Sequence, residues 1–138
     1  MQISRKAEYA LHALIYISST TGERACSINE IAENARIPRE YLAKVLKGLT
    51  NDGFLVSSRG INGGYRLKKA PKDITFLNVL EAAEGPFALT LCNDNKGCPD
   101  FAFWDDLRKR LITTLSEMNM SKVEFKKNNN KGKKASRP

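Results

Sequence analysis

Residues 27–65 constrain the fold most, because two short helical patterns there are followed by a glycine-rich turn. Ser27 and Glu30 predict a capping box, in which each side chain satisfies one free amide of a helix start. A second helix starts at Pro38, whose fixed φ suits a first helical position, and Gly53 ends it. Apolar residues recur at helical spacing in both patterns: Ile28, Ile31, Ala32 and Ala35, then Tyr41, Leu42, Val45, Leu46 and Leu49.

The connection between these helices is short and comprises residues 34–37. Such a connection is typical of a helix-turn-helix, whose second helix enters the major groove of DNA. The outer face of the second helix is polar and carries Arg39, Glu40, Lys44 and Lys47. This helix is therefore the candidate for DNA recognition.

A hairpin with a glycine-rich tip follows. Residues 54–56 and 65–67 form its strands, and Gly60, Gly63 and Gly64 permit a tight turn. Arg59, at the edge of this slender tip, could enter the narrow and electronegative minor groove. Taken alone, the segment could equally be an ordinary surface hairpin with a solvated arginine. Together with the helix pair, it predicts a mainly α fold with a small β-hairpin wing, a winged helix-turn-helix.

Three further helical patterns flank this unit. Residues 4–19 form a largely buried helix, with Lys6 near its start, where a DNA backbone could pass. Residues 76–83 form a core helix that ends at Gly85. Residues 101–118 form a long amphipathic helix, whose apolar stripe consists of Phe103, Trp104, Leu107, Leu111, Leu115 and Met118.

The long helix is too long and too apolar for a small domain to cover. We expect it to pair with its copy in a homodimer, because two-fold symmetry would place two recognition helices about one DNA turn apart. The alternative is a core helix within one chain. These patterns divide the chain into a DNA-binding domain (1–72), a cysteine loop with a dimerisation helix (73–118) and a basic tail expected to be disordered (119–138).

The distribution of charge supports a polyanionic partner. Residues 1–72 carry 12 Lys and Arg against 6 Asp and Glu, whereas residues 73–118 carry 4 against 8. Residues 119–138 carry 7 against 1. Basic residues thus accompany the helix-turn-helix and the tail, as expected of a protein that binds nucleic acid. The tail could add phosphate attraction or simply be a solvated end.

Other features limit the class of protein. No apolar run is long enough to span a bilayer and no leader follows Met1, so we expect a cytoplasmic protein without a membrane partner. An odd number of cysteines, three, argues against a disulfide framework, and Cys26 is expected to be a small buried residue.

An enzyme is disfavoured because there is one histidine and no nucleotide-binding glycine motif. A winged helix used for protein contact is the remaining rival.

Several motifs together resemble one family of bacterial regulators. They are the initial helix ISRKAEYALHAL, the helix-turn-helix, the wing RGINGGY at 59–65, the EGP sequence at 84–86, and a cysteine loop before a Trp-containing helix. The chain thus resembles, over residues 1–118, the Rrf2 family of winged helix-turn-helix transcriptional regulators, which includes IscR, NsrR, CymR and RirA.

The resemblance implies a homodimeric transcription factor, a repressor, that binds double-stranded DNA at a partly palindromic operator. By position, it implies base or phosphate contacts for Arg39, Glu40, Tyr41 and Lys44, and a minor-groove contact for Arg59. The chemistry is compatible, since lysine and arginine suit guanine acceptors and glutamate can accept from cytosine. Tyr41 could instead belong to the core.

The resemblance also implies a sensor of iron-sulfur, redox or nitrosative status in the cysteine loop. Family members that bind a cluster usually have three cysteines there, whereas this chain has Cys92 and Cys98, and Phe101 replaces a histidine found in some members. An iron-sulfur cluster remains possible with Glu8 of the partner subunit's first helix as a further ligand, as some members have. His12, Asp94 and Asp100 are other possible donors.

Two cluster-free alternatives stay open. Cys92 and Cys98 could form a disulfide on oxidation. Alternatively, neither cysteine is used, and a small molecule or a protein partner controls the regulator.

Overall fold

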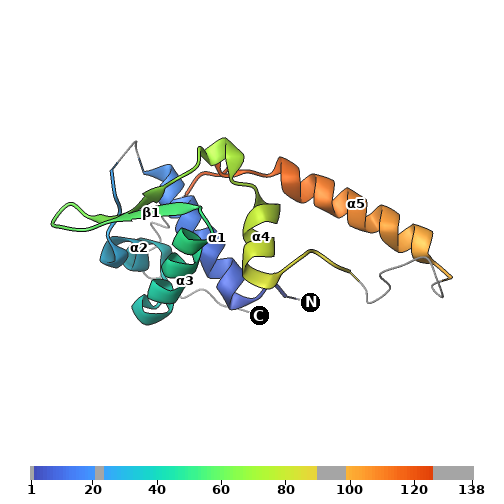
Figure 1. The fold of residues 1–138 in the computed structure, drawn as a ribbon, viewed down its shortest axis with the longest axis horizontal. Coiled ribbons are helices and arrows are strands. Elements are labelled where there is room, and N and C mark those ends of the chain that lie inside the picture. The colour runs from blue at the N-terminus through green and yellow to red at the C-terminus, as the bar shows by residue number, and fades with distance from the viewer. Residues whose placement is uncertain (1, 21–23, 90–98, 126–138) are drawn as a thin grey trace, which may run out of the picture.

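The computed structural model describes residues 2–20, 24–89 and 99–125. Within them, five α-helices and a two-stranded antiparallel hairpin form a winged helix-turn-helix with a projecting C-terminal helix (Figure 1). The predicted fold class is confirmed. In chain order the elements are α1 Arg5–Ser19, α2 Ile28–Ala35, α3 Arg39–Asn51, β1 Leu55–Ser58, β2 Gly64–Leu67, the 3-10 turn η1 Pro71–Asp73, α4 Phe76–Glu84, α5 Phe101–Glu117 and the 3-10 turn η2 Met120–Lys122.

Side-chain caps fix the starts of three helices. The hydroxyl oxygens of Ser4, Ser27 and Thr75 accept hydrogen bonds from amides in the first turns of α1, α2 and α4. Pro38 occupies the N-cap position of α3, so this helix begins one residue later than predicted. Gly53 follows α3 with a φ of 85°, a left-handed conformation that favours glycine and ends the helix as expected.

The capping box at the start of α2 is half formed. Ser27 Oγ accepts from the Glu30 amide at 3.1 Å, as predicted. The Glu30 carboxylate does not complete the reciprocal bond, because it accepts instead from Tyr16 and Arg24. Glu30 therefore joins α2 to α1 and to the segment before α2.

The core forms around α1, which packs against α2, α3, α4 and β2. Ala7, Ala13 and Leu14 are completely buried along this helix. Cys26 is also 0 % exposed, which confirms its interpretation as a small buried residue. The largest fully buried side chains are Leu14, Ile31, Leu42, Leu46, Leu55, Ile74 and Met120. Helix α4 is less of a core helix than expected, since Val79 is its one buried residue.

The wing is tied to the chain that precedes α2. Its strands pair from Leu55 with Leu67 to Ser58 with Gly64. Beyond this ladder, Cys26 and Tyr65 exchange two backbone hydrogen bonds of 2.8 Å. Gly64, with a φ of 144°, lies against the Cys26 carbonyl group, where an added Cβ would overlap it. The base of the wing is thus fixed to the helix-turn-helix.

The chain after α5 returns to the domain. The Met120 amide donates to the Ile74 carbonyl at 3.0 Å, and the Met120 side chain is 2 % exposed. Phe125 packs edge-on against the ring of Tyr16. The sequence placed a disordered tail from residue 119, but residues 119–125 are part of the packed structure. The remainder of the predicted tail, 126–138, lies outside the described residues.

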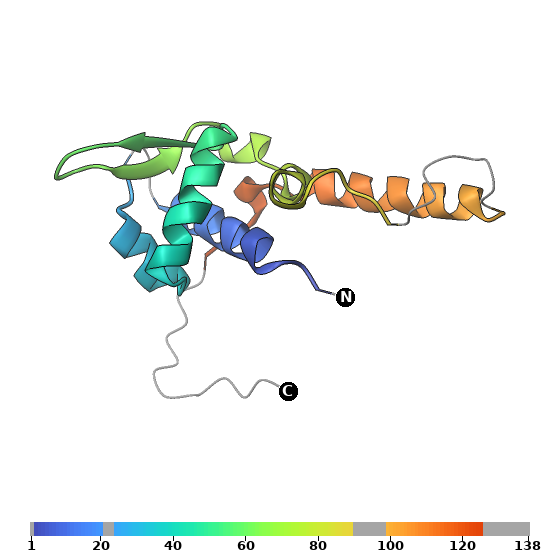
Figure 2. The same cartoon turned by 60° about the horizontal axis from the view of Figure 1, so that its bottom comes forward.

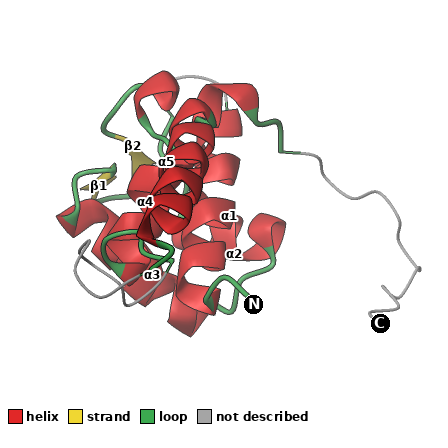
Figure 3. Ribbon diagram, turned by 90° about the vertical axis from the view of Figure 1, so that its right-hand side faces the viewer, coloured by secondary structure: helices red, strands yellow, loops and turns green. Residues whose placement is uncertain are grey.

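Helix α5 has its predicted extent but no buried residue. It packs against α4 and projects away from the body on the side opposite the wing (Figure 1), and the view in Figure 3 looks along this helix towards the body. Phe103 is 61 % exposed on its apolar stripe, with Leu111 and Met118 also exposed. Its stripe is not core within one chain. Among the described residues, no helix has the length and apolar character needed to cross a membrane.

Candidate nucleic-acid interface

Helix α3 presents a polar face outward because its apolar residues are anchored in the core. Leu42, Val45, Leu46 and Leu49 are buried. On the opposite side the side chains of Arg39, Glu40, Lys44 and Lys47 are exposed. In Figure 2, α3 (teal to green) lies across the front of the body and leads into the wing. Three of the residues predicted to contact DNA, Arg39, Glu40 and Lys44, therefore lie on one accessible surface.

Tyr41 is neither fully buried in the core nor free on the surface. It is 38 % exposed, yet its ring packs edge-on against Tyr9 of α1 with a centroid distance of 5.2 Å. The Tyr9 hydroxyl in turn accepts from Arg5 Nη1 at 3.2 Å. The sequence pattern did not reveal this chain of contacts, because it connects the first turn of α1 to the first turn of α3. Lys6, the predicted contact on α1, is exposed beside Arg5.

Arg59 is exposed directly after β1, at the predicted edge of the wing tip. The tip is closed by a hydrogen bond of 2.9 Å from the Gly63 amide to the Gly60 carbonyl, and Gly60 has a φ of 105°. Ile61 at the same tip is completely exposed. A slender turn thus presents one arginine and one apolar side chain to solvent.

A polar cluster of Glu30, Tyr16 and Arg24 lies next to Cys26, the residue that pairs with the wing. Glu30 accepts from Tyr16 Oη at 2.6 Å and from Arg24 Nη1 and Nη2 at 2.8 and 2.6 Å. The hydrogen bonds from Arg24, and then that from Tyr16, lower the pKa of Glu30 to about 2 although partial burial opposes this shift. Burial, followed by the bond to Glu30, raises the pKa of Tyr16 to about 12. Burial also raises the pKa of the neighbouring Cys26 thiol.

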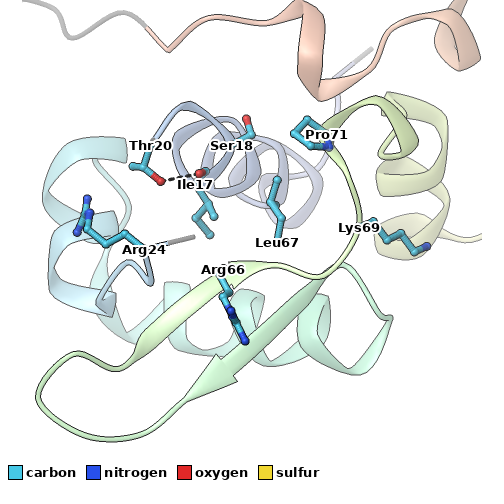
Figure 4. Close-up of a pocket in the computed structure, with 8 residues that line it drawn as sticks. All are labelled: Ile17, Ser18, Thr20, Arg24, Arg66, Leu67, Lys69 and Pro71. Carbon is cyan, nitrogen blue, oxygen red and sulfur yellow. Dashed lines mark hydrogen bonds between the residues drawn. The ribbon is translucent and has the colours of Figure 1, made fainter. Parts of the chain in front are cut away.

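A cavity of about 440 Å³ lies beside this cluster, between the end of α1 and strand β2 (Figure 4). Three of its lining residues, Arg24, Arg66 and Lys69, are cationic. Figure 4 shows their charged ends pointing in different directions, and Arg24 is paired with Glu30. The cations therefore do not converge on one point and form no anion-binding site.

The predicted cluster donors are dispersed or lie beyond the described part of the chain. Glu8 and His12 are exposed on α1, with Oε1 and Nε2 4.0 Å apart. Asp100 Oδ2 accepts from Trp104 Nε1 at 2.9 Å at the start of α5. Over the described residues, no three His, Cys, Asp or Glu side chains gather to hold a metal ion. Cys92, Asp94 and Cys98 lie outside those residues.

Known proteins share this architecture. A family model described as Rrf2, iron-dependent transcriptional regulator, matches residues 3–123. CymR of B. subtilis, described as the global cysteine regulator, is 26 % identical, with a TM-score of 0.78 over 88 % of this chain and 94 % of its own. Staphylococcus aureus CymR in an oxidized form is 25 % identical, with a TM-score of 0.69 over 87 % and 93 %.

A third solved structure, IscR of T. potens, shares the fold with 24 % identity and a TM-score of 0.72, over 88 % of this chain and 84 % of its own. The family match covers nearly the whole region in which the helix-turn-helix, wing and projecting helix are found. The chain therefore belongs to the Rrf2 family of DNA-binding transcriptional regulators, as its wing motif predicts, and is not an enzyme.

Proposed function

We propose that this chain acts as a homodimeric transcriptional repressor on a partly palindromic operator, with α3 in the major groove and Arg59 in the minor groove. The observation that carries the proposal is the accessible polar face of α3, whose opposite face is held in the core. A helix fixed in this way can present its side chains to base edges without bending.

The exposed groups suggest a division of roles. Arg39 and Lys44 can donate to guanine acceptors or phosphates, and Glu40 can accept from a cytosine amino group. Tyr41 contributes at most its hydroxyl end, since its ring is held by Tyr9. Lys6 is exposed in the first turn of α1, and its ammonium group can neutralise a phosphate.

The uncovered stripe of α5 supports the dimer. No α5 side chain is buried within one chain, and Phe103, Leu111 and Met118 expose large apolar surface to water. A second copy would cover this stripe by two-fold symmetry, which also repeats the recognition helix. The two copies of α3 would then face successive half-sites.

The signal enters, in this proposal, through the segment with Cys92 and Cys98, which connects α4 to α5. A change there can alter the spacing of the two recognition helices, because α5 holds the dimer together. A cluster would use these two cysteines, with Glu8 of a second chain as a further ligand; among the described residues of one chain, no group of three such donors could hold a metal ion. The family is described as iron-dependent, which supports testing for an iron-sulfur cluster first.

DNA binding is tested with duplexes selected from a random pool and titrated by fluorescence anisotropy. Arg59→Ala and Lys44→Ala should each weaken binding by about 10-fold or more, in line with about 1–3 kcal/mol for a good base contact. Lys122→Ala removes an exposed cation of η2, outside α3 and the wing, and should have little effect. If the unsubstituted protein selects no duplex, a protein-interaction module replaces this proposal.

The signal is tested on protein purified without oxygen. Visible absorption bands with stoichiometric iron and sulfide that disappear in Cys92→Ala and Cys98→Ala would support a cluster. A thiol switch would be indicated if the protein contains no iron and its operator affinity changes on oxidation. This change in affinity should then be absent from the same two variants. If the variant with both Cys92→Ala and Cys98→Ala changes its operator affinity on oxidation as the unsubstituted protein does, the cysteines are not part of the mechanism. A small molecule or a protein partner would then be the signal.

A further inference from the structure

Ile61, at the tip of the wing, is the most exposed large apolar side chain among the described residues. It is completely exposed, whereas Phe103, the next in this order, is 61 % exposed. Its side chain therefore contributes no buried area to the fold of one chain. Covering it with another surface would remove apolar area from water, which favours association.

The turn that contains Ile61 does not require an isoleucine. The Gly63 amide donates to the Gly60 carbonyl at 2.9 Å, so Ile61 and Asn62 are the central residues of a four-residue turn. Glycine, proline, asparagine, aspartate and serine are the residues favoured in turns, whereas isoleucine favours strands. A contact between the tip and a partner would account for an isoleucine that neither the turn nor the core explains.

The tip is narrow, and its strands are paired up to the turn. Gly63 has no room for a side chain, because an added Cβ would overlap the Ser58 carbonyl and the backbone of Arg59. The ladder ends with the pair of Ser58 and Gly64, and the base of the wing is bonded to Cys26. Figures 1 and 2 show the wing extending beyond the helices, away from α5. Ile61 thus lies at the outer end of the wing.

The charge near Ile61 indicates the kind of partner. Residues 57–64 contain one charged side chain, Arg59, and no carboxylate. Arg59 is exposed two residues before Ile61. A narrow tip with a cation and an apolar side chain matches the minor groove of DNA, which is electronegative and accepts apolar side chains. A membrane surface is a poorer match, because one isoleucine and one arginine bury little apolar area and supply little charge.

We propose that Ile61 packs in the minor groove beside Arg59 and there disfavours G·C base pairs. This inference rests on the proposed function, because it requires the wing to lie on DNA. In the minor groove A·T pairs present only acceptors, whereas a G·C pair adds the N2 amino group of guanine. An isoleucine against this amino group displaces its water and offers no acceptor in return.

Arg59 cannot compensate for the lost hydrogen bond, since a guanidinium group has donors only. Ile61 therefore adds specificity at the base pairs beneath the wing, in addition to the bases that α3 contacts. The neighbouring Asn62 is exposed at the other central position of the turn. Its amide can donate or accept, so it imposes no fixed preference between the two kinds of base pair.

Modified bases separate the amino group from the rest of the base pair. Inosine is guanine without the N2 amino group, and diaminopurine is adenine with one. Operators are made with A·T, G·C, inosine·C or diaminopurine·T at the pairs beneath the wing. These pairs are the ones whose protection from hydroxyl radicals disappears in Arg59→Ala at saturating protein. Fluorescence anisotropy then gives the affinity of each operator.

The unmodified protein should bind the A·T and inosine·C operators about 10-fold more tightly than the G·C and diaminopurine·T operators. Ile61→Val and Ile61→Thr have nearly the same shape but differ in a methyl and a hydroxyl group. Ile61→Val should keep most of the preference. Ile61→Thr should lose most of it, because a hydroxyl can accept from the amino group. Asn62→Ala, the control, should keep it. All three variants should unfold at the temperature of the unmodified protein, since these side chains are exposed.

An equal preference in Ile61→Val and Ile61→Thr would overturn this inference, because Ile61 would then not face the amino group. So would affinities that group A·T with diaminopurine·T and G·C with inosine·C, or four equal affinities. Failure of the proposed function is a separate result. In that case the unmodified protein selects no operator, or Arg59→Ala leaves its binding unchanged.

Discussion

Glu30 has a larger structural role than a helix cap. Its carboxylate accepts three hydrogen bonds, two from Arg24 and one from Tyr16. Tyr16 also carries the edge contact with Phe125. One carboxylate therefore connects α2, the segment before it, α1 and, through Tyr16, the end of the packed chain.

Glu30→Gln should lower the free energy of unfolding at pH 7 by about 1–2 kcal/mol, because the hydrogen bonds to a charged acceptor are removed. The pKa of Glu30 in the folded protein, about 2, is below its ordinary value of 4.5. The carboxylate thus stabilises the fold fully above pH 4.5, and this stabilisation is lost as the pH falls towards 2. The difference between the two proteins should therefore shrink over that range.

Urea unfolding followed by circular dichroism at pH 7 and pH 3 measures this effect. Glu33→Gln, on the exposed side of the same helix, is the matched control and should unfold like the unmodified protein. An equal loss of stability in Glu30→Gln at both pH values would show that the ionised carboxylate is not the source.

The Ser27 half of the capping box could be predicted from the sequence because a cap and its amide are three residues apart. The partners of Glu30 could not be predicted. Tyr16 and Arg24 belong to other segments, and the fold brings them to the carboxylate. Local spacing determines which group can cap a helix, whereas tertiary packing determines whether that group is used elsewhere.

At the scale of elements, the attachment of the wing can be tested at Gly64. Gly64→Ala should destabilise the protein strongly, because its φ of 144° is unfavourable for alanine and its Cβ would overlap the Cys26 carbonyl group. Gly48→Ala is the contrasting change. Gly48 lies inside α3, three residues before its end, and an added Cβ would meet no neighbouring group within 4 Å. This substitution should raise the free energy of unfolding by about 0.5–1 kcal/mol, since glycine is a poor helix former.

Thermal unfolding of the two variants measures these opposite effects. Equal melting temperatures for Gly64→Ala and the unmodified protein would mean that the wing can separate from Cys26 at little cost. A loss of stability in Gly48→Ala would indicate an unfavourable contact on α3.

The helices and the wing were predictable because caps, glycines and apolar periodicity act within each element. The packed stretch after α5 was not. Its sequence is mostly polar, and its anchors, Met120 and Phe125, are separated by four other residues. Their partners, Ile74 and Tyr16, are distant in the chain. Two anchors five residues apart match neither a helical nor a strand period, so composition alone indicated a tail.

At the scale of the whole molecule, α5 should determine both assembly and DNA affinity. Leu111→Lys places a charge on the exposed apolar stripe and should convert the proposed dimer to a monomer, because burying that charge in an interface is costly. Affinity for a two-half-site operator should fall towards that for one half-site. Analytical ultracentrifugation and DNA titration measure the two effects.

Thr113→Lys is the matched control for this prediction. Thr113 is exposed on the same helix but outside the apolar stripe, so its substitution adds the same charge without entering the expected interface. Dimers of normal stability in Leu111→Lys would contradict the assignment of the stripe to assembly, although the DNA-binding surface of each chain would still stand.

The pairing of Cys26 with Tyr65 closes the chain into a loop that contains the entire helix-turn-helix and most of the wing. Bending the wing at its base would break both of these backbone bonds, so we expect the wing to move together with the helix-turn-helix. In the proposed dimer, we therefore expect a regulatory signal to change the relative orientation of the two DNA-binding units through α5, with each wing staying fixed to its own helix-turn-helix.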